Sequence, residues 1–356
     1  MNQACDATSA VATGERAPFR RIFITGGSGY VGRNLIRHFV TTGVSVVALA
    51  RSQKAADRVR QLGATAFMGD LLSPDIAAGM AGCDALVHAA ADTDHGPGTP
   101  QQRRVNEDGT RIVMEAARAA GIRKAIHIST ESVLADGHPL VQVEETAPFP
   151  RRPAGSYSRS KAAAERVALA ASSPAFPVVA LRPRFVWGRD DTTALPALVE
   201  AARSGKLAWI AGGTYLTSTT HIANLCQAVA LALANGRGGE VYFITDGDAV
   251  PFRTFVSQLL ETQGIVPPEK SVPRAVVRAV AWGGDVLAAL SRGRISVPLT
   301  SQAYATSAVE ISLDIGKAKL ALGYVPVISR EQGLDELRTV STGSPPVAAP
   351  CPACLP

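Results

Sequence analysis

The segment from Arg21 to Gly32, Arg-Ile-Phe-Ile-Thr-Gly-Gly-Ser-Gly-Tyr-Val-Gly, most constrains what this chain can fold into. It starts as an apolar run of β-forming residues and breaks at Thr25 into a turn with four glycines. A helical apolar pattern follows at once, carried by Val31, Leu35, Ile36, Phe39 and Val40. The segment therefore predicts a strand, a glycine turn and a helix N-terminus in direct succession.

A unit of this kind is an anion site. Glycines let the backbone approach a pyrophosphate, and the unpaired N–H groups at the positive end of the helix dipole hold it. The spacing Gly27-x-Gly29-x-x-Gly32 fits the dinucleotide fingerprint. We expect the cofactor to contact Gly26, Ser28, Gly29, Tyr30, Val31 and Gly32.

The next strand bears on which dinucleotide is bound. Residues 44–50 predict a buried parallel strand, at whose end dinucleotide-binding units usually carry an acidic residue for the ribose 2′-hydroxyl. Here Arg51 and Ser52 follow Ala50. A carboxylate would repel a 2′-phosphate, whereas an arginine can bind it bidentately. The sequence favours NADP, and NAD remains the alternative if Arg51 is simply solvated.

Strand-like and helical patterns alternate along the rest of the N-terminal half, which predicts an α/β fold with a Rossmann-type doubly wound parallel sheet. We expect a flexible leader (1–17), an NAD(P)-binding Rossmann domain (18–185, with 225–247 returning to it), a smaller C-terminal substrate lobe (186–224 and 248–340) and a disordered tail (341–356).

Tyr157 and Lys161 stand four residues apart at the start of a predicted helix, so they share one face. A free tyrosine has a pKa of about 10 and is a poor acid or base at neutral pH. A nearby ammonium favours the phenolate, and lysine can also hold the nicotinamide ribose. After a glycine-turn unit and several strands, the pair predicts acid–base chemistry beside a nicotinamide.

On these motifs the chain resembles the extended short-chain dehydrogenases/reductases over residues 20–340. Residues 25–32 are similar to their TGxxGxxG loop and residues 157–161 to their YxxxK pair, while residues 69–71 and 88–91 look like the adenine-side and cofactor-flank segments. The resemblance implies an NAD(P)-dependent oxidoreductase and further cofactor contacts by Asp70, Leu71, Ala89, Ala90, Ala91, Pro183 and Val186.

The family also has a catalytic Ser or Thr on the strand before the tyrosine helix. The resemblance puts Thr130 there, with Ser129 as a close competitor. Its hydroxyl would hydrogen-bond the substrate oxygen as hydride moves. The alternative is a strand-end hydroxyl that only satisfies backbone groups.

One residue helps to choose among branches of the family. Nucleotide-sugar epimerases and dehydratases usually carry an Asn where this chain has Phe185, and an apolar ring cannot replace its hydrogen bonds. Residues 182–188, 219–224 and 242–247 resemble instead the 3β-hydroxysteroid dehydrogenase branch, which often uses NAD. We therefore expect interconversion of a secondary alcohol and a ketone on an apolar, alicyclic or steroid-like molecule. A sugar-nucleotide epimerase or dehydratase with tightly bound NAD is the alternative.

Composition excludes several other classes. The net charge is +6, but the basic residues are scattered, so nucleic acid is not an expected partner. Without an apolar run of 18 residues, no stable membrane insertion is expected. The five cysteines, including Cys351-x-x-Cys354 in the tail, imply no disulfide framework and suggest the cytoplasm. The loop 92–98 is expected to be a mobile rim rather than a metal site.

Two expectations concern surfaces. The apolar helix predicted over residues 275–290 would pack on the small lobe, and the alternatives are that it roofs an apolar pocket or touches a membrane surface. The family resemblance implies a homodimer formed through helices of the Rossmann lobe.

Overall fold

The computed structural model describes residues 19–96, 98–291 and 299–343. The expected leader and the Cys351/Cys354 pair lie outside the described residues. The last helix, α13 (Arg330–Gly343), continues through residues 341–343, where we expected the tail to have begun.

Seven parallel strands form the central sheet in the order β12-β7-β5-β4-β1-β2-β3. This confirms the predicted doubly wound α/β fold, with the chain reversing direction across the sheet between β1 and β4. The strands are β1 (Arg21–Thr25), β2 (Ser45–Ala50), β3 (Thr65–Met68), β4 (Ala85–His88), β5 (Lys124–Ile128), β7 (Val178–Pro183) and β12 (Val241–Ile244).

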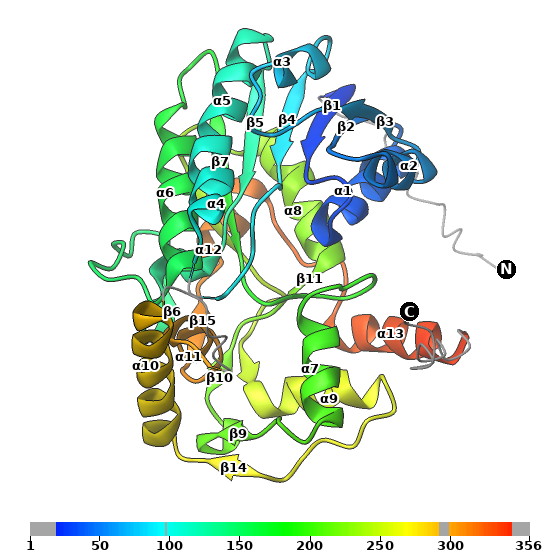
Figure 1. Ribbon diagram of the computed structural model, residues 1–356. Coiled ribbons are helices and arrows are strands. Elements are labelled where there is room, and N and C mark those ends of the chain that lie inside the picture. The colour runs from blue at the N-terminus through cyan, green and yellow to red at the C-terminus, as the bar shows by residue number, and fades with distance from the viewer. Residues whose placement is uncertain (1–18, 97, 292–298, 344–356) are drawn as a thin grey trace, which may run out of the picture.

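Helices cover both faces of this sheet (Figure 1). In β1, Ile22 and Ile24 join one apolar core with residues of α1 and α8, while Phe23 joins a second core with residues of α3 and α5. Alternate side chains of a strand point to opposite faces, which explains why an unbroken apolar run is needed. The helices of this lobe are α1 (Tyr30–Thr41), α2 (Gln53–Gln61), α3 (Ile76–Gly79), α4 (Pro100–Arg103), the π-helical η1 (Arg104–Asp108), α5 (Gly109–Ala119), α6 (Ser156–Ala170), α8 (Ile222–Asn235) and α12 (Gly316–Leu322).

A smaller sheet, in the order β13-β10-β15-β6, lies below the large one in Figure 1. Its strand β6 comes from residues 140–143, inside the range expected for the Rossmann domain. The four strands are β6 (Leu140–Val143), β10 (Leu216–Thr217), β13 (Val250–Pro251) and β15 (Ile311–Leu313). Two short parallel pairs join β8 (Val186–Trp187) to β11 (Thr220–His221) and β9 (Trp209–Ile210) to β14 (Ser271–Val272). The remaining elements are η2 (Glu131–Leu134), α7 (Ala194–Arg203), η3 (Ala211–Gly213), α9 (Phe252–Glu261), α10 (Arg274–Leu290) and α11 (Ser301–Ser307).

The apolar helix α10 is buried on one side only. Val277 and Ala281 are buried, whereas the opposite side exposes Val276, Val280, Trp282, Val286, Leu287 and Leu290. None of the described helices has the combination of length and apolar character needed to cross a membrane.

A buried ion pair joins helix α6 to the central sheet. On β7, Arg182 donates from Nε to Oε2 of Glu165, at 2.9 Å, and from Nη2 to Oε1, at 2.5 Å. The two side chains are 3% and 0% exposed. Because a lone buried charge costs several kcal/mol, either residue depends on the other. The pair fixes the helix that carries Tyr157 and Lys161 against β7.

We therefore expect Arg182→Met to lower the free energy of unfolding by about 3–5 kcal/mol, because Glu165 would be left charged and unpaired. Urea denaturation followed by circular dichroism measures the loss. Arg60→Met, which removes an exposed pair with Asp57, is the control and should cost less than about 1 kcal/mol. Equal small losses in both variants would contradict the account.

Candidate active site

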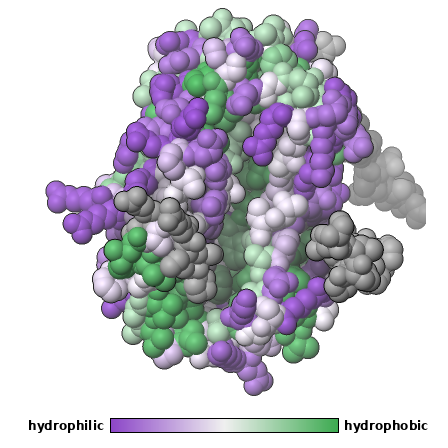
Figure 2. Space-filling view, viewed as in Figure 1, coloured by the Kyte–Doolittle hydropathy of each residue, from purple (hydrophilic) through white to green (hydrophobic). Residues whose placement is uncertain are grey.

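The candidate site residues gather at one edge of the large sheet. Because its strands are parallel, the segments that follow them all leave from their carboxyl ends. That edge thus carries the glycine turn after β1, residues 51–52 after β2, 70–71 after β3, 89–91 after β4, 129–130 after β5 and 183–186 at the end of β7. Figure 2 shows a groove on this side of the molecule, with a hydrophobic floor.

The glycine turn leaves no room for side chains at its closest approaches. Gly26 has a φ of +71°, and a Cβ on Gly32 would lie 2.1 Å from the carbonyl oxygen of Gly26. Gly29 precedes α1, and no side chain among the described residues caps the helix there. The first backbone N–H groups of α1, from Tyr30 on, are thus left for a ligand. The turn fits a dinucleotide pyrophosphate.

The other expected cofactor contacts surround this turn. Arg51 is exposed at the end of β2, and Ser52 Oγ caps α2 by accepting from Ala55 N at 3.3 Å. Asp70 is also exposed, and its Oδ1 accepts from Leu72 N at 2.8 Å. After β4, residues 89–91 are half-buried, and Ala90 N donates to Thr25 Oγ1 at 3.2 Å. The structure therefore brings these segments together along the sheet edge.

Tyr157, near the start of α6, is half-buried. Its ring packs edge-on against His95, with 4.6 Å between ring centroids. Burial raises the pKa of Tyr157, the nearby Glu131 carboxylate raises it further, and a hydrogen bond with Thr130 lowers it. His95 comes from the loop 92–98, which we expected only to form a rim. Among the described residues no three His, Cys, Asp or Glu side chains gather as a metal-binding group.

Lys161 is buried one turn along α6, and its Nζ donates to the carbonyl oxygen of Ile128 at 2.7 Å. Burial lowers the pKa of Lys161 to about 8, although Glu165 opposes the shift. We expected Lys161 to lower the pKa of Tyr157. Instead, burial and the Glu131 carboxylate have the largest effects on this pKa, and both raise it. The spacing of the two residues predicted their shared helix face but not the burial of the phenol.

Ser129 and Thr130 have different surroundings. Ser129 Oγ donates to Glu165 Oε2 at 2.5 Å, within the buried pair that fixes α6. Thr130 Oγ1 donates to Glu131 Oε2 at 2.8 Å and hydrogen-bonds with Tyr157. Only Thr130 therefore lies among the groups that face the tyrosine hydroxyl.

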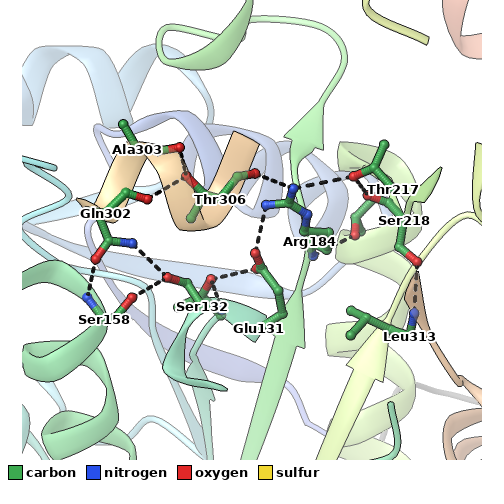
Figure 3. Close-up of polar contacts among 12 residues, drawn as sticks. Glu131, Ser132, Ser158, Arg184, Thr217, Ser218, Gln302, Ala303, Thr306 and Leu313 are labelled. Atoms are coloured by element: carbon green, nitrogen blue, oxygen red, sulfur yellow. Dashed lines mark hydrogen bonds and ion pairs between the residues drawn. The ribbon is translucent and has the colours of Figure 1, made fainter. Parts of the chain in front are cut away.

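Sequence reasoning missed Glu131 and Arg184. Arg184 Nη1 donates to Glu131 Oε1 at 2.8 Å, and both side chains are buried (Figure 3). Each stands next to a residue that we had singled out, Glu131 after Thr130 and Arg184 before Phe185. Two opposite charges that directly follow predicted strands were the available signal, but nothing in their spacing paired them.

Residues 183–186 leave the sheet edge toward the small lobe. Pro183 is buried at the end of β7, and Val186 is half-buried in β8. Phe185 adopts a φ of +44°, and its ring packs against Phe252 and Phe255 at 6.3 and 5.4 Å between centroids. It contributes to the apolar core of the small lobe and offers no hydrogen bond to a ligand.

Comparisons with known proteins agree with this geometry. Residues 23–274 match the model of the 3-beta hydroxysteroid dehydrogenase/isomerase family. A ketoreductase of 4-hydroxy-2-methyl-3-oxo-4-farnesyl-3,4-dihydroquinoline-1-oxide from Stigmatella aurantiaca is 46% identical over 89% of this chain and 96% of its own. A 2-alkyl-3-oxoalkanoate reductase from Stenotrophomonas maltophilia is 33% identical over 90% and 99%.

Solved structures share the fold. The crystal structure of gox2253 is 27% identical, with a TM-score of 0.73 over 90% of this chain and 98% of that one. The dTDP-glucose 4,6-dehydratase DesIV from Streptomyces venezuelae, solved with NAD, has a TM-score of 0.71 over 90% and 96%; at 24% identity it shows the fold alone. The chain belongs to the 3β-hydroxysteroid dehydrogenase/isomerase family, and it is an NAD(P)-dependent oxidoreductase of the extended short-chain dehydrogenase/reductase type.

Proposed function

We propose that this protein interconverts a ketone and a secondary alcohol on an apolar, alicyclic small molecule. The observation that carries the proposal is the group of Tyr157, Thr130 and Lys161 at the carboxyl edge of a dinucleotide-binding sheet. The names of the relatives support ketoreduction, and one of them acts on a farnesylated ring compound. The hydrophobic floor of the groove in Figure 2 suits such a substrate.

In the proposed mechanism, Tyr157 moves the proton. During ketone reduction its hydroxyl donates the proton to the developing alkoxide, and during alcohol oxidation the phenolate accepts it. Thr130 holds the tyrosine hydroxyl in place, and Lys161 on the same helix supports the phenolate and binds the nicotinamide ribose. The bound nicotinamide supplies or accepts the hydride. Ser129 instead donates a hydrogen bond to Glu165 and so helps to hold α6 in place.

NADP is the cofactor that we favour. The exposed Arg51 stands at the end of β2, where a carboxylate would otherwise select the ribose 2′-hydroxyl. A guanidinium can bind a 2′-phosphate bidentately, and the neighbouring Ser52 can add a hydroxyl donor. The glycine turn holds the pyrophosphate of either dinucleotide, so the choice rests on Arg51.

Two further parts of the proposal come from the family resemblance and composition. We propose a homodimer formed through helices of the Rossmann lobe, and a cytoplasmic location. The described cysteines support a reducing compartment, because Cys83 and Cys226 are buried free thiols.

Tyr157→Phe should reduce turnover of a panel of cyclic ketones by at least about 10²-fold, because the proton donor is lost. NADPH binding should change little, since the ring remains. Absorbance of the reduced cofactor measures turnover, and fluorescence titration measures binding. Near-normal turnover in this variant would refute the assignment.

Arg51→Ala should raise the dissociation constant of NADPH by about 10- to 100-fold, because a charged hydrogen-bond pair is lost, and should change that of NADH little. Fluorescence titration with both dinucleotides measures the effect, and Arg60→Ala on the neighbouring helix is the matched control. Tighter binding of NADH that is unaffected by Arg51→Ala would instead indicate an NAD enzyme.

A further inference from the structure

A second buried ion pair lies beside the candidate hydroxyls and has no part in the mechanism above. Glu131 begins η2 directly after Thr130, and Arg184 follows β7. Their side chains are 4% and 6% exposed and are joined by a contact of 2.8 Å. Charges this deep persist only when they are paired and hydrogen-bonded. The fold therefore maintains a compensated carboxylate next to the proposed proton donor.

The contacts of Thr130 give Glu131 a direct connection to the chemistry. A hydroxyl has one proton and two lone pairs. Thr130 Oγ1 directs its proton to Glu131 Oε2, at 2.8 Å, and accepts from Ser132 N at 3.2 Å. Thr130 also lowers the pKa of Tyr157, and the two segments are joined beside it by a contact of 2.6 Å between Ser132 Oγ and Ser158 Oγ. Glu131 thus determines where the hydroxyl of Thr130 directs its proton.

The small lobe holds Arg184 in place. Its Nη2 donates to the carbonyl oxygen of Thr306 on α11, at 2.6 Å, and to Thr217 Oγ1 on β10, at 3.3 Å (Figure 3). Its Nε is buried and finds no partner among the described residues. Gln302, also on α11, donates to Ser132 Oγ at 3.1 Å and so links the same helix to η2. The cation that balances Glu131 is therefore fixed by elements of the other lobe.

We propose that Arg184 is a positioning residue for the reaction: it acts through Glu131, fixing the hydroxyl of Thr130 and opposing the negative charge that faces Tyr157. This inference rests on the proposed function. The Tyr157 phenolate is needed when the enzyme oxidises an alcohol, and an uncompensated carboxylate beside it would disfavour that anion. Arg184 thereby lets the fold keep an orienting acceptor for Thr130 with a smaller charge penalty at Tyr157.

The surroundings of Tyr157 make Glu131 the charge to test. After burial, the carboxylate of Glu131 is what raises the pKa of Tyr157. The elements packed against α6 are η1, η2, α4, α5, α11 and β7. The titratable or charged groups on these elements, on α6 itself and on the loop after β4 are Asp92, Asp94, His95, Arg103, Arg104, Glu107, Asp108, Arg111, Glu115, Arg118, Glu131, Arg159, Lys161, Glu165, Arg166, Arg182 and Tyr304, with Arg184 just beyond β7.

The test measures the ionisation of Tyr157 without any substrate. Each variant of the full chain is titrated by the ultraviolet absorbance of tyrosine phenolate, and the same variant carrying Tyr157→Phe is subtracted. The titration runs upward from about pH 9, and the variants are compared by the Tyr157 phenolate formed at each pH, which gives the relative order of their midpoints. Glu131→Gln removes the carboxylate and leaves Arg184 cationic, so more phenolate should form than in the wild type, by up to about tenfold for each pH unit by which the midpoint falls.

The other variants should move in defined directions. Arg184→Met leaves Glu131 uncompensated, so less Tyr157 phenolate should form than in the wild type at every pH. The double variant Glu131→Gln/Arg184→Met removes both charges and should return the midpoint toward the wild-type value. Arg60→Met, which removes an exposed ion pair with Asp57 on α2, is the control and should leave the Tyr157 midpoint in place.

A merely structural pair would destabilise the protein in all three variants without opposite effects on Tyr157. The inference is overturned if Glu131→Gln shows no more Tyr157 phenolate than the wild type, or if both single variants shift the midpoint in the same direction. Its failure is distinct from failure of the proposed function, which shows as normal turnover in Tyr157→Phe.

Discussion

The site depends on one constraint, a parallel sheet buried on both faces. Each strand needs apolar residues on both sides, and each connection must pass through a helix that covers one of the faces. All carboxyl ends therefore meet at one edge, where the helices leave behind loops with unused polar groups. The glycine turn, Arg51 and Thr130 are far apart in sequence, and the topology alone brings them to this edge.

Two buried ion pairs give the hydroxyls beside them different roles, one in holding α6 and the other next to Tyr157. Glu165 and Arg182 fix α6 to β7 and engage the hydroxyl of Ser129. Glu131, which begins η2, pairs with Arg184 just beyond β7 and accepts from the hydroxyl of Thr130. Neighbouring hydroxyls with similar sequence surroundings thus acquire different roles from the carboxylate that each one meets.

The sequence predicted the features that depend on residues close together along the chain. The glycine turn, the helix phase of Tyr157 and Lys161, and the strands of the large sheet are consequences of short-range spacing, and the family and fold followed from them. Contacts between segments far apart along the chain could not be predicted from the sequence. The entry of β6 into the small sheet, the pairing of Glu131 with Arg184, and the His95 ring on Tyr157 each join segments separated by a loop whose path no pattern encodes. The raised pKa of Tyr157 depends on burial, which helix spacing cannot report.

The central claim is net hydride transfer to a ketone of an apolar ring compound. The most direct measurement supplies the full chain with NADPH carrying deuterium at the transferable position of its nicotinamide, together with a panel of cyclic ketones, and analyses the products by mass spectrometry. The account predicts an alcohol with deuterium on the carbinol carbon and matching consumption of NADPH. An alcohol without deuterium, or cofactor that cycles with no net consumption as an epimerase would require, would contradict it.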